Sequence, residues 1–211
     1  EPLIEIINLQ LKYSETFLQF NLIFHPTNSN EEEVIFQNNS ISVKSFPLRH
    51  RVPTTGFRFD EAPRNASIIR EKIEKLNIPT VFLQQLKRGK DCVDLDGTVY
   101  KSAELTKPAP ASRSYAYCSD TRAFESYVSS IQNVDLLYHE STFMHDMKER
   151  AIETLHSTAL EAAQVAKHVG AKKLLLGHYS ARYRELNPLV EEAKLEFFNS
   201  ELSFEGKWYN V

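Results

Sequence analysis

The sequence has little cysteine, no long apolar run and none of the common nucleotide or serine-hydrolase motifs. Its two cysteines, Cys92 and Cys118, lie far apart without a CxxC pair, so we expect reduced thiols in a cytoplasmic protein. No apolar run reaches the length that spans a bilayer, and no signal segment opens the chain, so we expect no membrane partner. GxSxG, P-loop and GxGxxG motifs are absent, and His139-Glu140 does not continue to HExxH because residue 143 is Phe.

The composition fits one globular domain. The chain has 211 residues, 42% of them hydrophobic, which is enough for a single core. A formal net charge of −3 argues against a generally basic nucleic-acid binder, so any nucleic acid must be bound by local cations. Because the chain begins at Glu1 and not Met, we expect the true N-terminus to be missing or processed.

The chain changes from strands to alternating strands and helices. Residues 17–24 and 41–46 predict strands separated by the polar stretch 26–33, with a short strand at 56–59. From residue 114, short apolar runs at 115–118, 134–138 and 173–176 predict buried strands with helices between them. Another helix is expected at 187–198, followed by a last strand. This order predicts a layered α/β fold.

The clearest helix follows Thr158. Thr158 and Glu161 have capping-box spacing, an alanine-rich face follows, and Gly170 ends the helix. Between the two halves of the chain we expect, in order, a helix at 66–76 capped by Asn65, a short helix from Thr80 to Gly89, a hairpin turn at 94–97 and an extended return through Pro108 and Pro110.

Polar side chains follow three of the predicted buried strands. Asp120 follows the strand predicted at 115–118, His139 and Glu140 follow the one at 134–138, and His178 follows the one at 173–176. The carboxyl ends of neighbouring strands in α/β folds open onto one crevice, so these side chains are expected to converge. Each alone has a plain alternative as a turn former or a structural histidine, whereas three together favour a metal or catalytic site.

His156 stands immediately before the clearest helix. An imidazole there would lie beside free backbone N–H groups that accept phosphate, and it could donate a proton near neutral pH. The alternative is a routine cap in which only Thr158 matters. His25 and His145 are interpreted as surface or loop residues, and His168 as a helix-end residue favoured by the helix dipole.

Five motifs in order resemble one family. They are Pro47-Leu48-Arg49-His50 with Thr55-Gly56-Phe57-Arg58, Cys118-Ser119-Asp120-Thr121-Arg122, His139-Glu140-Ser141-Thr142-Phe143, His156-Ser157-Thr158, and Gly177-His178-Tyr179-Ser180-Ala181-Arg182-Tyr183. Together they cover residues 47–185 and resemble ribonuclease Z, the zinc-dependent endoribonuclease that removes the 3′ trailer of precursor tRNA. The resemblance implies an α/β fold, the C-terminal part of a metallo-β-lactamase αββα sandwich with an inserted exosite arm.

The resemblance also implies residue roles. His50, Asp120 and His178 match zinc ligands, with Asp120 at the carboxylate that bridges the two ions.

The remaining matches concern the proton and the phosphate. Glu140 and His156 match an acid pair that protonates the departing ribose oxygen. Arg182 matches a position near the scissile phosphate, and Ser157 and Thr158 are expected to bind substrate beside His156.

The segment 60–110 matches the family's tRNA-binding arm. Lys87, Arg88 and Lys90 cluster around Gly89, as phosphate binding requires, although a solvated helix end is an equal alternative. The family's Gly-Pro pair is absent from the arm, where Pro79 is followed by Thr80.

The family's HxHxDH block, which supplies most ligands of both zinc ions, is also absent. We therefore expect residues 1–211 to be a single incomplete domain, inactive by itself, that holds zinc weakly or not at all. An opened sheet favours a homodimer. Two other functions stay open: another hydrolase of this fold acting on esters, sulfates or phosphodiesters, and a non-catalytic tRNA-binding or dimerisation module.

Overall fold

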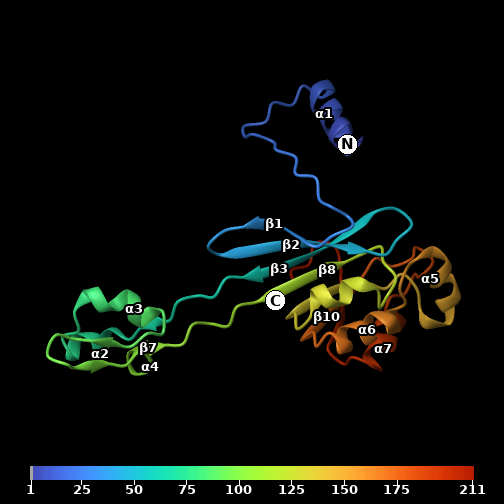
Figure 1. Cartoon of the computed structure of the whole chain (residues 1–211). Coiled ribbons are helices and arrows are strands. Elements are labelled where there is room, and N and C mark those ends of the chain that lie inside the picture. Colours follow the sequence, from blue (N-terminus) through green and yellow to red (C-terminus); the bar gives the residue numbers. More distant parts are fainter. Residues whose placement is uncertain (1) are drawn as a thin grey trace.

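A mixed seven-stranded sheet organises the computed structural model, which describes residues 2–211 (Figure 1). The strands, in sheet order, are β1 (Glu33–Gln37), β2 (Ile41–Leu48), β3 (Thr54–Glu61), β8 (Ser114–Cys118), β9 (Leu136–Glu140), β10 (Lys173–Gly177) and β11 (Ser200–Leu202). β1 to β3 and β8 pair antiparallel, whereas β8 to β11 are parallel. The parallel half needs long crossovers, which the helical segments supply.

Two helices cover one face of the parallel half. α6 (Ala159–His168) packs against β9 and β10, and α7 (Asn187–Lys194) packs against α6 and β11. The helix face is built from alanines with no exposed area, among them Ala162, Ala163 and Ala166, so the α6 backbone can approach the sheet closely. The capping box of Thr158 and Glu161 is present, which confirms the predicted start of this helix.

Shorter elements connect the strands. η2 (Ser126–Ile131) precedes β9, and η3 (His145–Met147) and α5 (Lys148–Thr154) lie between β9 and α6. The opposite sheet face carries half-buried aromatic side chains, with Tyr117 stacked on Tyr138 at 4.7 Å between ring centroids. Cys92 and Cys118 are both free, as their spacing predicts, and both are buried. Within residues 2–211 no helix is both long and apolar enough to cross a membrane.

The segment between β3 and β8 forms a separate small body on two extended connections (Figure 1). Its elements are β4 (Ser67–Ile68), α2 (Arg70–Lys75), η1 (Thr80–Phe82), α3 (Leu83–Lys87), β5 (Cys92–Val93), β6 (Val99–Tyr100), α4 (Ser102–Leu105) and β7 (Thr106–Lys107). It has its own core of Ile78, Leu86, Cys92 and Leu105. The hairpin predicted at 94–97 is present between β5 and β6.

Several sequence-based expectations are wrong. Residues 17–24 form no strand, because their aromatic side chains lie exposed without a partner strand; instead α1 (Pro2–Tyr13) and β1, neither of them predicted, flank this region. Asn65 caps no helix: Ser67 and Ile68 pair with β7, so the helix begins only at Arg70. The helix predicted to reach residue 198 ends at Lys194.

Candidate metal and catalytic site

Three neighbouring parallel strands bring their polar ends together. Asp120 follows β8, Glu140 ends β9 and His178 follows β10, with Cys118 opposite His139 and Leu176 opposite His139 in register. Asp120 and His178 have φ values of 56° and 55°. A left-handed backbone at non-glycine residues is costly and persists where the surrounding structure fixes it, which is frequent at functional sites.

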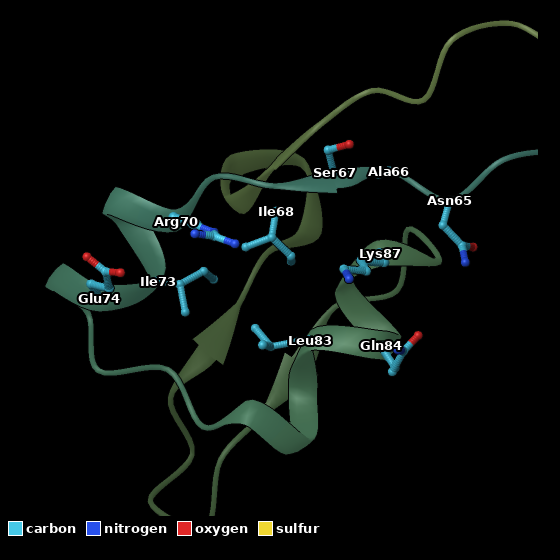
Figure 2. Close-up of a pocket in the computed structure, with 10 residues that line it drawn as sticks. All are labelled: Asn65, Ala66, Ser67, Ile68, Arg70, Ile73, Glu74, Leu83, Gln84 and Lys87. Carbon is cyan, nitrogen blue, oxygen red and sulfur yellow. The ribbon is translucent and has the colours of Figure 1, made fainter.

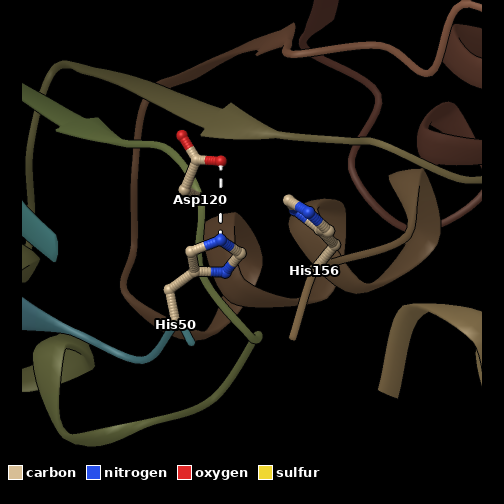
Figure 3. Close-up of side chains that lie close together, drawn as sticks. All are labelled: His50, Asp120 and His156. Atoms are coloured by element: carbon tan, nitrogen blue, oxygen red, sulfur yellow. Dashed lines mark ion pairs between the residues drawn. The ribbon is translucent and has the colours of Figure 1, made fainter. Parts of the chain in front are cut away.

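Two imidazoles point at one carboxylate oxygen. The Nε2 atom of His178 lies 3.3 Å from Oδ1 of Asp120, and Nε2 of His50 lies 3.9 Å from the same oxygen. Figure 3 shows the His50 ring below the Asp120 carboxylate, with His156 beside them. Nδ1 of His50 donates to the backbone carbonyl of Leu155 at 3.2 Å, which fixes its tautomer and turns Nε2 toward Asp120.

These donors fit a divalent metal such as zinc. Imidazole nitrogens and a carboxylate oxygen are its usual ligands. His50, Asp120 and His156 place such atoms within 4.8 Å of one another, so this group contains His156 where the sequence predicts His178. A second group, Glu140, His156 and His178, meets the same spacing. We interpret that second group as a hydrogen-bonded pair beside a ligand, because the Glu140 carboxylate is buried and its oxygens are already occupied by donors.

Glu140 is the buried acceptor at the centre of the site. Its carboxylate has no exposed area and accepts hydrogen bonds from the backbone N–H groups of Thr121 and Ser157, from Oγ1 of Thr142 at 2.6 Å, and from the ring of His156. Burial opposes ionisation, but the hydrogen bonds and charge of His156, with the other donors, outweigh it and hold the pKa of Glu140 below its usual range.

His156 is the partner of that carboxylate. Its Nδ1 lies 3.0 Å from Oε2 of Glu140, and this hydrogen bond raises the pKa of His156 against the opposing effect of burial. The ring centroid lies 4.9 Å from that of His50 and 5.3 Å from that of His178. The pair therefore favours a charged imidazole held by a carboxylate, directly beside the candidate metal ligands, which is an arrangement able to donate a proton.

A hollow of about 320 Å³ opens beside these rings. It is lined by His50, Arg51, Glu153, Thr154, Leu155 and His156. A larger hollow of about 700 Å³ lies in the small body between β3 and β8, where Figure 2 shows Ile68, Ile73 and Leu83 around an open space and Lys87 at its side. The larger hollow is lined by one carboxylate, Glu74, and by no histidine, whereas His50 and His156 line the smaller one.

The backbone N–H groups before α6 are not free. Ser157 and Thr158 are fully buried, their N–H groups donate to Glu140 and Glu161, and Oγ of Ser157 donates to the Thr121 carbonyl. The expectation of open phosphate-binding N–H groups at this helix is therefore wrong, because side-chain carboxylates occupy them.

The predicted substrate-binding cations lie outside the cluster of histidines and carboxylates. Arg182 is exposed, its guanidinium 5.1 Å above the Phe143 ring, and that ring lies 6.3 Å from His156. Arg88 and Lys90 are exposed on the small body between β3 and β8, and Lys87 is half-buried there.

Among the other histidines, His139 has a structural role. It is buried, with Nδ1 2.8 Å from the Glu140 carbonyl and Nε2 2.7 Å from the Tyr127 hydroxyl. Sequence reasoning missed the side chains that connect the site, Thr121 and Thr142. Oγ1 of Thr142 lies 2.9 Å from Nδ1 of His178 as well as bonding Glu140, a contact between distant segments for which the sequence holds no signal beyond the motif itself.

Curated relatives match nearly the whole chain. It is 43% identical over 208 residues to ribonuclease Z of Cytophaga hutchinsonii, covering 98% of this chain and 66% of the relative. It is 43% identical over 210 residues to ribonuclease Z of Parabacteroides distasonis, covering 100% of this chain and 67% of the relative. The chain thus spans about two thirds of the length of the curated relatives it matches. No protein-family model matches it.

Solved structures match at the level of the fold. The short form of human tRNase Z has a TM-score of 0.56 at 22% identity, over 95% of this chain and 61% of that one. The metallo-β-lactamase fold protein YhfI from Bacillus subtilis has a TM-score of 0.51 at 18% identity, over 83% and 49%. The sheet and helices described above are therefore those of a metallo-β-lactamase fold.

Proposed function

This chain belongs to the ribonuclease Z family, and from that premise we propose that the full-length protein is a zinc-dependent endoribonuclease that removes the 3′ trailer of precursor tRNA. One observation carries the proposal: the Glu140–His156 pair lies against the cluster of His50, Asp120 and His178. The pair supplies a proton donor and the cluster supplies metal ligands. The two groups that metal-dependent phosphodiester hydrolysis requires therefore lie side by side.

His50, Asp120 and His178 would hold the metal. Zinc, when bound, supplies Lewis acidity that favours attack on phosphorus and offsets charge on the phosphate oxygens. The carboxylate of Asp120 would hold the metal together with these histidines, because both imidazoles face its Oδ1 atom. Within residues 2–211 this set is small for two ions, so we propose that the 211-residue chain alone binds zinc weakly and is inactive. Elemental analysis that finds two tightly held zinc ions per chain would contradict this.

His156 would protonate the departing ribose oxygen. The hydrogen bond to Glu140 raises the pKa of His156 and fixes its ring, so that the nitrogen opposite Nδ1 would be the one left to donate. Arg182, whose guanidinium lies over the Phe143 ring, would contact a phosphate of the bound RNA.

The test is replacement of His156 in the full-length protein. His156→Ala is expected to slow precursor-tRNA cleavage by about 100-fold or more, the size of a general-acid contribution. His168→Ala is the matched control, because His168 is exposed at the end of α6 and should leave cleavage unchanged. Unaltered cleavage by His156→Ala would remove the role assigned to this residue.

The body at residues 60–110 would be the tRNA-binding arm. Between residues 60 and 110 the chain has nine lysines and arginines against eight acidic residues, so the arm as a whole is nearly neutral and the local cluster of Lys87, Arg88 and Lys90 would have to bind the phosphates. We expect the combined change of Lys87, Arg88 and Lys90 to glutamine to weaken precursor binding and to reduce its dependence on salt. Unchanged binding would assign these cations to a solvated helix end.

The homodimer and the cytoplasmic location stay predictions, and sedimentation of the full-length protein tests the homodimer.

A further inference from the structure

One buried arginine contacts the backbone of the candidate site. Arg122 lies two residues after Asp120, and its Nη1 donates to the backbone carbonyl of His156 at 3.2 Å. The same nitrogen lies 3.3 and 3.4 Å from the two carboxylate oxygens of Glu161. The Arg122 side chain is only 17% exposed and that of Glu161 only 6%. The guanidinium is therefore pinned inside the protein and is not available to a substrate.

A positive charge at the position of Arg122 is electrostatically unfavourable, so stabilisation of the fold does not explain it. It lies against the N-terminal end of α6, where the helix dipole favours negative charge and disfavours a cation. Glu161 offsets that charge, but Glu161 also completes the capping box with Thr158, and a glutamine can fill that capping role without any arginine nearby. The helix start therefore gives no reason for a buried cation, whereas the contact with the His156 carbonyl does.

The backbone around Arg122 connects the same loop to the third part of the site. The N–H group of Arg122 donates to the carbonyl of Arg49 at 3.0 Å, and Oγ1 of Thr121 accepts from the N–H group of Arg49 at 3.1 Å. Arg49 directly precedes His50. Through its main chain and its side chain, one residue thus links the segments that carry His50, Asp120 and His156.

From this geometry we infer that Arg122 is a positioning residue, which sets the place of the His156 imidazole relative to the Asp120 carboxylate. The inference rests on the proposed function, because it assigns Arg122 to the step in which His156 gives a proton to the leaving oxygen. Arg122 acts through the backbone of His156 and touches neither substrate nor metal. A displacement of about 1 Å at a proton donor costs on the order of 100-fold in rate, so the loss of this contact is measurable.

The experiment compares two substrates in the full-length protein. Precursor tRNA has a ribose oxygen as leaving group, which needs a proton, whereas bis(p-nitrophenyl) phosphate releases p-nitrophenolate, which leaves without one. Arg122→Met is expected to lower kcat on precursor tRNA by about 10-fold or more with KM within about twofold, and to lower kcat on the chromogenic diester by less than about threefold. Arg122→Lys, which can still reach the carbonyl, is expected to recover part of the loss.

Two further variants guard against a plain folding defect. Arg122→Met/Glu161→Gln removes the buried negative charge that Arg122→Met leaves unpaired, keeps the cap, and should show the same substrate selectivity. Arg150→Met is the matched control, because Arg150 forms an exposed pair with Glu153 at 3.0 Å and should change neither reaction.

Equal losses on the two substrates, or no loss on either, would overturn the positioning role. A wild-type protein that leaves precursor tRNA intact would instead overturn the proposed function itself, and this inference with it.

Discussion

Replacing Glu140 by glutamine tests the centre of the site through stability. The Glu140 carboxylate is completely buried and accepts from His156, Thr142 and two backbone N–H groups. In Glu140→Gln one acceptor oxygen becomes an NH₂ group that faces donors, and the charge opposite His156 is lost. Removal of one partner from a buried, hydrogen-bonded ion pair costs about 3–5 kcal/mol, a large part of the roughly 5–15 kcal/mol that holds a typical domain together.

Chemical denaturation followed by circular dichroism at pH 7 measures this loss. In a domain of this size each kcal/mol corresponds to about 2–4 °C in Tm, so the thermal midpoint should fall by about 6–20 °C. Glu153→Gln is the matched control, since Glu153 is exposed and pairs with Arg150, and it should cost less than about 1 kcal/mol. A loss below about 1 kcal/mol for Glu140→Gln would refute the view that this carboxylate organises the site.

Two other changes test the surrounding sheet. A Cβ at Gly177 would overlap the Tyr138 hydroxyl and ring, so Gly177→Ala is expected to destabilise the fold by about 1–3 kcal/mol. In a double-mutant cycle of unfolding free energies, Tyr138→Ala in the same chain should relieve most of that loss, and simple additivity would contradict the clash. Burial raises the pKa of Asp135, but Lys172 and Ser114 outweigh it and hold the pKa below the ordinary 3.8, so the stability that Asp135 contributes is present above that pH and lost as pH falls through the folded pKa. Asp135→Asn should therefore flatten the loss of unfolding free energy below about pH 4, and an unchanged acid transition would contradict this.

The sequence predicted the parts of the fold that depend on local pattern. Short apolar runs located β8, β9 and β10, and their parallel order alone brings Asp120, Glu140 and His178 to one edge. The capping box of α6 was equally visible, because it needs only two residues three positions apart.

The parts that failed depend on partners distant in the chain. Residues 17–24 have strand-forming side chains but no neighbouring strand, and strand propensity is expressed only in a sheet. Asn65 has a capping side chain, yet pairing of Ser67 with Lys107 takes the backbone out of a helix. The contacts of Arg122 and Thr142 join segments tens of residues apart through single atoms, which no spacing rule encodes.

The most direct measurement of the central claim is the cleavage point on a 3′-extended precursor tRNA incubated with the full-length protein, before and after removal of metal by a chelator and again after zinc is restored. The proposed function predicts a single cut after the discriminator base, which is lost with the chelator and recovered with zinc. Protonation of the departing ribose oxygen by His156 predicts that this cut leaves a 3′-hydroxyl on the tRNA. Cleavage at other positions, or cleavage at the same position that persists without metal, would contradict the account.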